Sequence, residues 1–197
     1  MRIYNLNLRA QAVKRQEPGK RLYSGLSTET MAAANLLRPK DPLPRGAAIR
    51  EAEPVDIDAV TALDARITGL AKPDYWRRAY TRYGTRPTRY FLVAEIAGRV
   101  RGFVLGEERA WEFGSPPSGW VFAIGVDPDA REGGIGARLF AAICARMKAS
   151  GVKTVRTMLA RDDALNMAFF RSQGMRGGPF IQLEMPLDEV SSEESSP

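Results

Sequence analysis

Apolar positions along the chain follow two periods, and the change between them predicts a mixed α/β domain. Most positions in 120–126 are branched or aromatic, as in a buried strand, and Pro128 has no backbone N–H with which to continue the pairing. Apolar residues then recur every three or four positions from Ile135 to Met147, which predicts a helix that Gly151 closes. The centre of the chain is therefore a strand, a glycine turn and a helix.

The same two periods predict the remaining elements. Before the central strand they predict a short strand over 47–52, helices opened by Pro54 and Pro73, and a hairpin of strands 90–96 and 100–107. After the central helix they predict a strand over 152–159, a helix over 164–173 and a last strand over 180–185. A right-handed crossover would set 152–159 parallel to 120–126, beside the glycine turn. We expect one mixed sheet covered by helices over 47–188.

Charge divides the chain into a neutral body and a basic N-terminal segment. The net charge of +6 lies in residues 1–46, with nine Lys or Arg against three Asp or Glu, whereas the rest carries twenty of each. Without a sustained period, residues 1–46 read as a disordered basic leader or linker, and 189–197 read as a polar acidic tail. An organelle transit peptide, a basic arm and sequence upstream of a start at Met31 all fit the leader. The neutral body gives no support for a nucleic-acid partner.

Cysteine and histidine usage limits the chemistry. A single cysteine fits a reducing, cytoplasmic compartment, and the absence of histidine excludes an imidazole base and histidine metal ligands, so we expect no metal site. Cys144 lies on the apolar face of the central helix, where we expect a buried structural thiol. No apolar run approaches the roughly 18 residues of a membrane span, so we expect no membrane partner.

The glycines of the central turn suit an anion. The first amides of a helix have no internal partner, and Gly133, Gly134 and Gly136 leave a phosphate group unobstructed access to them. A tight strand-to-helix turn without a ligand is the alternative. Ala137 and Arg138 follow the turn in place of the Lys-Ser/Thr of a Walker loop, and Leu139 disfavours the dinucleotide fingerprint.

Arg131-x-x-Gly134-x-Gly136 resembles the Arg/Gln-x-x-Gly-x-Gly/Ala signature of the GNAT superfamily of acetyl-CoA-dependent N-acetyltransferases, and the resemblance covers roughly residues 49–185. It implies a GNAT-like acyl-CoA N-acyltransferase fold, in which two parallel strands splay apart to take the pantetheine arm. It further implies cofactor contacts at Ile124, Gly125, Val126, Arg131, Glu132, Gly133, Gly134, Ile135, Gly136, Ala137, Asp163 and Phe170.

Two of these positions depart from the family pattern. Phe169-Phe170-x-x-x-Gly174 resembles a Phe-Tyr-x-x-x-Gly segment, which places Phe170 where many members carry a tyrosine that protonates the leaving thiolate. Asp163 stands where many members carry Asn. Phe170 has no proton to donate, so it either faces the cleft without acid function or packs in the core.

The acceptor side is less marked in the sequence. In the family, the first two helices form one wall of the acceptor site, and the aromatic run at Tyr75, Trp76, Tyr80 and Tyr83 fits either that wall or ordinary helix packing. The central strand has no carboxylate that could serve as a general base. Glu108 and Glu112 are the nearest catalytic candidates, as a base or as an attractor of a cationic amine, and each also fits a solvated charge.

These observations favour an N-acetyltransferase that moves an acetyl group from acetyl-CoA to a primary amine of a small molecule, peptide or protein. Direct attack by a neutral amine requires no covalent enzyme intermediate, so the lack of histidine is no obstacle. A non-catalytic acyl-CoA-binding module and, more distantly, a nucleotide-binding regulatory domain are the alternatives. We expect a monomer or a homodimer.

Overall fold

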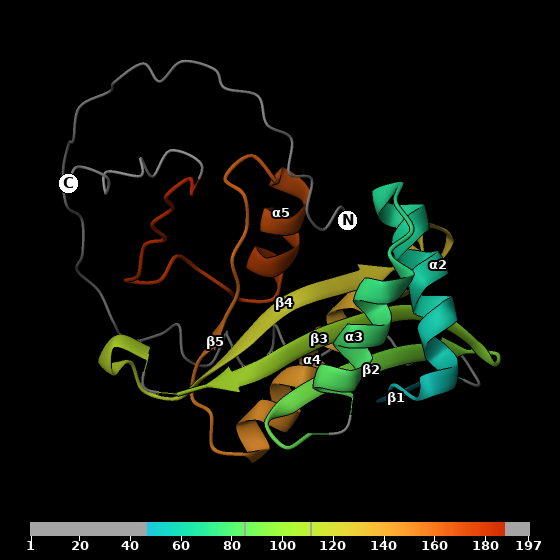
Figure 1. Cartoon of the computed structure of the whole chain (residues 1–197), viewed down its shortest axis with the longest axis horizontal. Coiled ribbons are helices and arrows are strands. Elements are labelled where there is room, and N and C mark those ends of the chain that lie inside the picture. The colour runs from blue at the N-terminus through green and yellow to red at the C-terminus, as the bar shows by residue number, and fades with distance from the viewer. Residues whose placement is uncertain (1–46, 85, 111, 188–197) are drawn as a thin grey trace, which may run out of the picture.

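A computed structural model of the chain describes residues 47–84, 86–110 and 112–187 (Figure 1). The leader predicted at 1–46 and the tail predicted at 189–197 lie outside the described residues. The domain limits at 47 and 188 therefore stay predictions.

Within the described residues, five strands form one mixed sheet in the order β1-β2-β3-β4-β5. The strands are β1 (Ala47–Glu51), β2 (Arg89–Ile96), β3 (Arg99–Arg109), β4 (Ser118–Val126) and β5 (Val155–Arg156). Neighbours from β1 to β4 pair antiparallel, and β5 pairs parallel with β4. The predicted α/β class, the hairpin of β2 and β3 and the parallel pair are confirmed.

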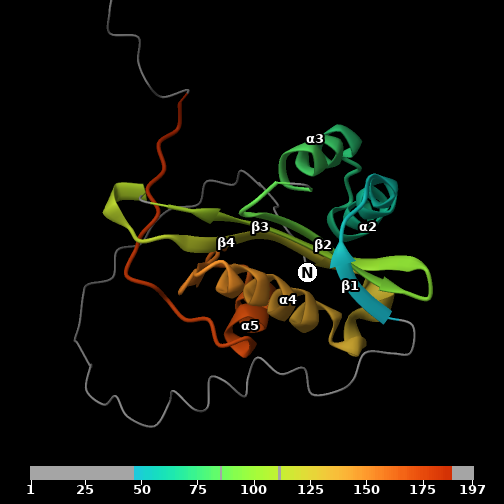
Figure 2. The same ribbon diagram turned by 90° about the horizontal axis from the view of Figure 1, so that it is seen from below.

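Helices cover both faces of the sheet (Figure 2). On one face lie α2 (Ile57–Thr68), which follows the short helix η1 (Pro54–Asp56), and α3 (Pro73–Tyr83); on the other lie α4 (Ile135–Ala149) and α5 (Ala164–Ser172). Short helices η2 (Glu112–Gly114) and η3 (Pro128–Gly133) flank β4. Local sequence sets these bounds: Pro73 occupies the first turn of α3, and Gly69 ends α2 at a φ of 78° that disfavours other residues.

Alternating strand residues separate two apolar cores, one on each face. Between the sheet and α4, buried residues such as Leu92, Val104 and Leu139 pack together; between the sheet and α2 and α3, Phe91 and Phe103 are equally buried. Each such side chain contributes roughly 1.5–3 kcal/mol of burial free energy, so both helical layers are held firmly on the sheet. Cys144 borders the α4 core, and burial raises the pKa of its thiol to about 11. The thiol is therefore protonated at neutral pH, as expected of a structural cysteine.

The predicted strand over 152–159 is shorter in the structure. Hydrogen-bonded pairing is confined to Val155 and Arg156, which lie opposite Gly119 and Trp120 of β4. Beyond Trp120 the two segments separate, as Figure 1 shows. A strand requires a backbone partner, and apolar alternation does not supply one.

The strand predicted over 180–185 is wrong. This segment has no regular structure, and its apolar side chains face outward, with Ile181 and Leu183 84% and 85% exposed. The guanidinium carbon of Arg156 lies 4.2 Å from the centroid of the Phe180 ring. This contact does not extend the sheet, because β5, to which Arg156 belongs, is only two residues long. The alternating pattern is present, yet in the described chain no strand edge pairs with it.

Candidate active site

Asp127 fixes the turn that follows β4. Its carboxylate accepts hydrogen bonds from the amide of Asp129 at 3.1 Å and from Arg101 Nη1 of β3 at 2.6 Å, and Arg66 Nη1 of α2 lies 3.0 Å away. Burial alone would raise the pKa of this carboxyl, but the hydrogen bonds and the two guanidinium charges hold it below its usual range. The turn is thereby tied to β3 and to the last turn of α2.

Gly134 begins α4 in the left-handed conformation, with φ 64°. Its carbonyl accepts the bond from the amide of Arg138 at 3.2 Å, so the amides ahead of Arg138 have no partner inside the helix. A Cβ atom on Gly134 would meet no atom within 4 Å, and one on Gly133 would meet only Ile135, at 3.8 Å. The start of α4 therefore combines unpaired amides, positive helix-dipole charge and open space.

Gly136 has a different role from Gly134. A Cβ atom there would lie 3.2 Å from the ring of Phe169 and 3.4 Å from Val126, so glycine allows α4 to approach α5 and β4. Ile135 is buried in the α4 core, and Ala137 is half-buried. The structure gives the backbone of residues 131 and 132 within η3 but does not describe their side chains.

The end of β4 has an open backbone edge. The amide of Asp127 donates to the carbonyl of Arg101 in β3 at 2.8 Å. Successive residues of a strand direct their N–H and C=O groups to alternate sides, so Gly125 also bonds toward β3, whereas Ile124 and Val126 point away from it. Pairing with β5 stops at Trp120, which leaves these two residues without a strand partner on that side in the described chain. The three predicted contact residues of β4 thus lie beside the start of α4.

Phe170 and Asp163 have structural contacts of their own. Phe170 is 4% exposed in the core beneath α4, with its ring edge-on to Phe140 at 5.5 Å and to Phe169 at 5.0 Å. Of the two predicted alternatives for Phe170, this geometry matches packing in the core. The ring that lies next to Gly136 belongs to the neighbouring residue, Phe169. Asp163 caps α5 by accepting a hydrogen bond from the amide of Asn166 at 3.0 Å.

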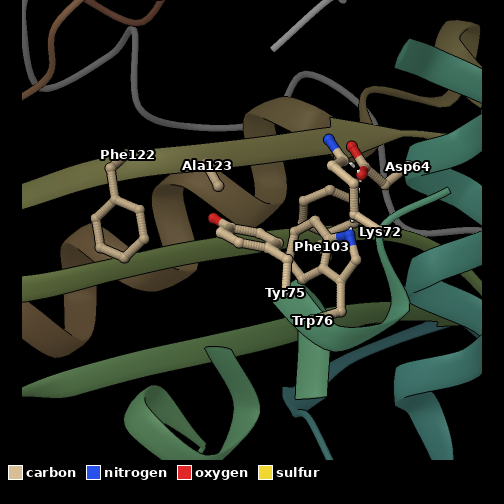
Figure 3. A pocket seen from close by; sticks show the side chains of 7 residues that line it. All are labelled: Asp64, Lys72, Tyr75, Trp76, Phe103, Phe122 and Ala123. Atoms are coloured by element: carbon tan, nitrogen blue, oxygen red, sulfur yellow. Dashed lines mark hydrogen bonds and ion pairs between the residues drawn. The ribbon is translucent and has the colours of Figure 1, made fainter. Parts of the chain in front are cut away.

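A pocket of about 350 Å³ lies on the opposite face of the sheet, under α2 and α3 (Figure 3). It is lined by Asp64, Lys72, Tyr75, Trp76, Phe103, Phe122 and Ala123. Asp64 and Lys72 lie at one end and Phe122 at the other, and Ala123 directly precedes the open edge of β4. Two residues of the predicted aromatic wall, Tyr75 and Trp76, line this pocket, while Tyr80 and Tyr83 pack against Phe91 and Phe122.

Asp64 is a buried carboxylate at the base of this pocket. It is 2% exposed, and its Oδ2 accepts a hydrogen bond from Trp76 Nε1 at 2.9 Å and pairs with Lys72 Nζ at 2.8 Å. Two residues further along α2, Arg66 reaches the glycine turn through Asp127. One end of α2 therefore borders both the pocket and the turn.

The structure does not bring Glu108 to this site. Its carboxylate accepts hydrogen bonds from Tyr90 and from Ser150, the residue that caps the far end of α4. At 1.5 Å per residue, the fifteen residues of α4 span about 22 Å between Ser150 and the glycine turn. The backbone of residue 112 lies in η2, and its side chain is not described.

Asp64 and Lys72 are not among the residues predicted from the sequence, although the sequence carries a signal for Asp64. Val60, Leu63, Asp64 and Ile67 occupy one buried helical face, at spacings of three and four residues. An aspartate within such a face must find a partner to offset its burial, so its position marks a specific contact. Nothing comparable marks Lys72, whose contact with Asp64 depends on how the chain turns between α2 and α3.

Comparison with known proteins identifies the family. The acetyltransferase (GNAT) family model matches residues 57–175, which is well over half of the chain. This chain therefore belongs to the GNAT acetyltransferase family. The match contains β2 to β5, the glycine turn and α2 to α5, so the predicted resemblance and fold are confirmed.

Curated relatives share part of their length with this chain. The mycothiol acetyltransferase of Saccharomonospora viridis is 30% identical over 152 residues, covering 69% of this chain and 48% of that protein. The L-2,4-diaminobutyric acid acetyltransferase of Nocardia farcinica is 32% identical over 87 residues, 44% of either protein. The chain thus spans about half the length or less of the curated relatives it matches.

Solved structures with this fold include the aminoglycoside N-acetyltransferase AAC(6')-Iy in complex with CoA. It superposes with a TM-score of 0.64 at 16% identity, covering 74% of this chain and 99% of that one. The aminoglycoside 6'-N-acetyltransferase AAC(6')-Ih of Acinetobacter baumannii gives a TM-score of 0.62, also at 16% identity, over 72% of this chain and 99% of its own. At such low identity the likeness establishes the shared fold.

The first prediction concerns Asp127 and acid stability. Because the folded-state pKa of Asp127 lies below the unfolded value of about 3.9, its ion pairs stabilise the fold above pH 4 and are lost as pH falls through the folded pKa. Asp127→Asn should cost about 1–3 kcal/mol at pH 7, and the difference from wild type should shrink toward pH 2. Melting temperatures between pH 7 and pH 2 measure this, with the exposed Asp58→Asn as a control; a difference that stays constant with pH would refute it.

The second prediction concerns Phe170. Phe170→Tyr places a hydroxyl among Phe140, Phe169 and other buried apolar groups, and an unpaired buried hydroxyl costs about 1–3 kcal/mol. The melting temperature should fall by several degrees without a gain in turnover, whereas Phe169→Tyr, at a half-buried position, should melt close to wild type. A faster Phe170→Tyr enzyme of unchanged stability would show that residue 170 faces the cleft.

Proposed function

We propose that this domain transfers the acetyl group of acetyl-CoA to a primary amine by direct attack of the neutral amine on the thioester. Pantetheine bonds the open edge of β4 at Ile124 and Val126, and the pyrophosphate takes the amides at the start of α4 around Gly134. Residues 131–137 supply the rest of the cofactor turn. The domain extends over 47–188, and the single, half-buried cysteine fits a cytoplasmic compartment.

One observation carries this proposal: the pocket under α2 and α3 opens beside the residues expected to hold the cofactor. Ala123 lines the pocket and Ile124 begins the open edge, so a thioester bound along β4 would reach an acceptor in the pocket. The pocket volume of about 350 Å³ falls in the usual range for small-molecule sites, roughly 300–1,000 Å³. Relatives named as acetyltransferases of mycothiol and of L-2,4-diaminobutyric acid support a small-molecule acceptor.

The chemistry requires little from the protein beyond alignment. Holding the amine and the thioester together replaces a bimolecular encounter, and no covalent intermediate is needed. As the new C–N bond forms and the C–S bond breaks, the amine nitrogen gives up one proton to water. Since residue 170 is a buried phenylalanine, the departing CoA thiolate takes its proton from water; it is an alkyl thiolate like that of free cysteine, whose thiol pKa is about 8.5, and so leaves readily. Glu108, held at the far end of α4, keeps a structural role in this scheme.

Thiol release from acetyl-CoA tests the proposal. Wild-type protein should release free CoA faster when pooled primary amines, peptides or aminoglycosides are added, and mass spectrometry should find one of them acetylated. Binding of acetyl-CoA without amine-dependent release would favour a non-catalytic acyl-CoA-binding module. Competition by NAD for the CoA site would instead favour a nucleotide-binding domain.

The third prediction places the cofactor at the glycine turn. Gly134→Ala adds a methyl group where the phosphate would approach and should lower CoA affinity tenfold or more, about 1.4 kcal/mol. Gly98→Ala is the matched control, because Gly98 also has a positive φ, 73°, and open space around it, but lies in the β2–β3 hairpin. Calorimetry should find weakened CoA binding in Gly134→Ala alone. Equal CoA affinity in both variants would refute phosphate binding at the glycine turn.

A further inference from the structure

Charge in the acceptor pocket comes from one pair. Of the residues that line it, Asp64 and Lys72 are charged and the others are aromatic or, at Ala123, small. Asp64 is 2% exposed and lies at the base, while the Lys72 side chain is 30% exposed. The lysine therefore presents its charge where a bound acceptor can reach it, and the aspartate does not.

Asp64 is already engaged by its neighbours. One carboxylate oxygen, Oδ2, receives both the indole N–H of Trp76 and the ammonium of Lys72. A second cation at this carboxylate would have to displace Lys72. The ammonium of Lys72, in contrast, carries three N–H donors, of which the Asp64 contact uses one.

Lys72 is held in place at both ends. Its backbone precedes Pro73 at the start of α3, and its Nζ is fixed by Asp64 on the neighbouring helix α2. A carboxylate bonded to the outer side of Nζ would lie closer to the ammonium than to Asp64, and Coulomb energy falls with distance, so the net interaction is attractive. The helix dipole at the start of α3 adds to this attraction.

We propose that Lys72 selects acceptors that carry a carboxylate in addition to the amine that is acetylated, with Asp64 positioning the lysine. The inference rests on the proposed function, in which this pocket holds the acceptor. The carboxylate bonds Lys72 at the Asp64 end of the pocket, and the aromatic walls guide the amine along Ala123 toward the thioester at β4 (Figure 3). The substrate class is thus amino-acid-like, and plain diamines are poorer acceptors.

Matched acceptors that differ by one carboxylate test this, and form the fourth prediction. Free L-ornithine and putrescine are one such pair, and free L-lysine and cadaverine are another. The wild-type chain of 197 residues should show at least a tenfold higher kcat/KM for the amino acid of each pair. Lys72→Met should abolish this preference, chiefly by raising KM for the amino acids relative to KM for the diamines.

Two further variants separate positioning from structure. Asp64→Asn should reduce the preference less than Lys72→Met, since the lysine remains but loses its anchor. Lys153→Met removes an exposed lysine outside the pocket and should keep the preference. An unchanged preference in Lys72→Met, equal use of both members of each pair by wild type, or better use of the diamines would overturn the proposal. So would a loss of CoA affinity in Lys72→Met, because the lysine would then belong to the cofactor site.

Direct binding distinguishes a failure of this inference from a failure of the proposed function. If no amine is acetylated, calorimetry of the four compounds with wild type and Lys72→Met decides the question without turnover. Binding of the amino acids over the diamines, lost in Lys72→Met, would support the carboxylate site even if acetyl transfer were disproved. Absence of that discrimination would overturn the site whether or not acetyl transfer occurs.

Discussion

Among the described residues, β4 has a strand partner on one side only beyond Trp120, and the rest of the site depends on this constraint. An unpaired backbone amide or carbonyl in the interior costs about 1–3 kcal/mol, so an open edge beside an apolar core is costly unless water or a ligand bonds it. The edge persists because β5 pairs for only two residues and the chain then moves away to form α5. A ligand with amide groups of its own, such as pantetheine, would complete the bonding of β4 as a further strand does in other sheets.

Ion pairs hold the elements around this edge in a fixed relation. Arg66 and Arg101 converge on the buried carboxylate of Asp127, so the last turn of α2, the strand β3 and the glycine turn meet at one point. Two residues before Arg66, Asp64 bonds Lys72 and Trp76, which line the pocket on the face of the sheet that α2 and α3 cover. The same turn of α2 thereby aligns the proposed acceptor pocket with the proposed cofactor turn. Alignment of this kind is what direct transfer between two bound substrates requires.

Local patterns predicted most of the fold because its elements carry strong local signals. Pro73 and the apolar run of α4 each set an element through backbone chemistry or helical period, and the structure agrees at both. The segment 180–185 shows the limit: its alternation resembles a strand, but a strand exists only where a second edge bonds it, and that is a non-local property. Residue 170 shows the same limit at the site, since a family motif gives its position along α5 but not the face on which its side chain packs.

The proposed acceptor pocket was the least predictable part of the site. Asp64 stands out in the apolar stripe of α2, whereas its partner Lys72 lies in a loop with no periodic signal. Glu108 was a candidate catalytic residue because it follows a predicted hairpin strand. In the structure its side chain bonds Ser150 and does not line the pocket. Spacing along one strand cannot reveal which helix end will lie beneath a given carboxylate.

Amide hydrogen exchange with and without CoA tests the central claim, that a ligand completes the open edge of β4, most directly. The amides of Ile124 and Val126 and those at the start of α4 should exchange more slowly by tenfold or more when CoA is bound, since each would gain a hydrogen-bond acceptor. Gly125, whose amide already points to β3, provides an internal reference and should change far less. Equal slowing of all three β4 amides, or no slowing at Ile124 and Val126 with CoA bound, would contradict the account.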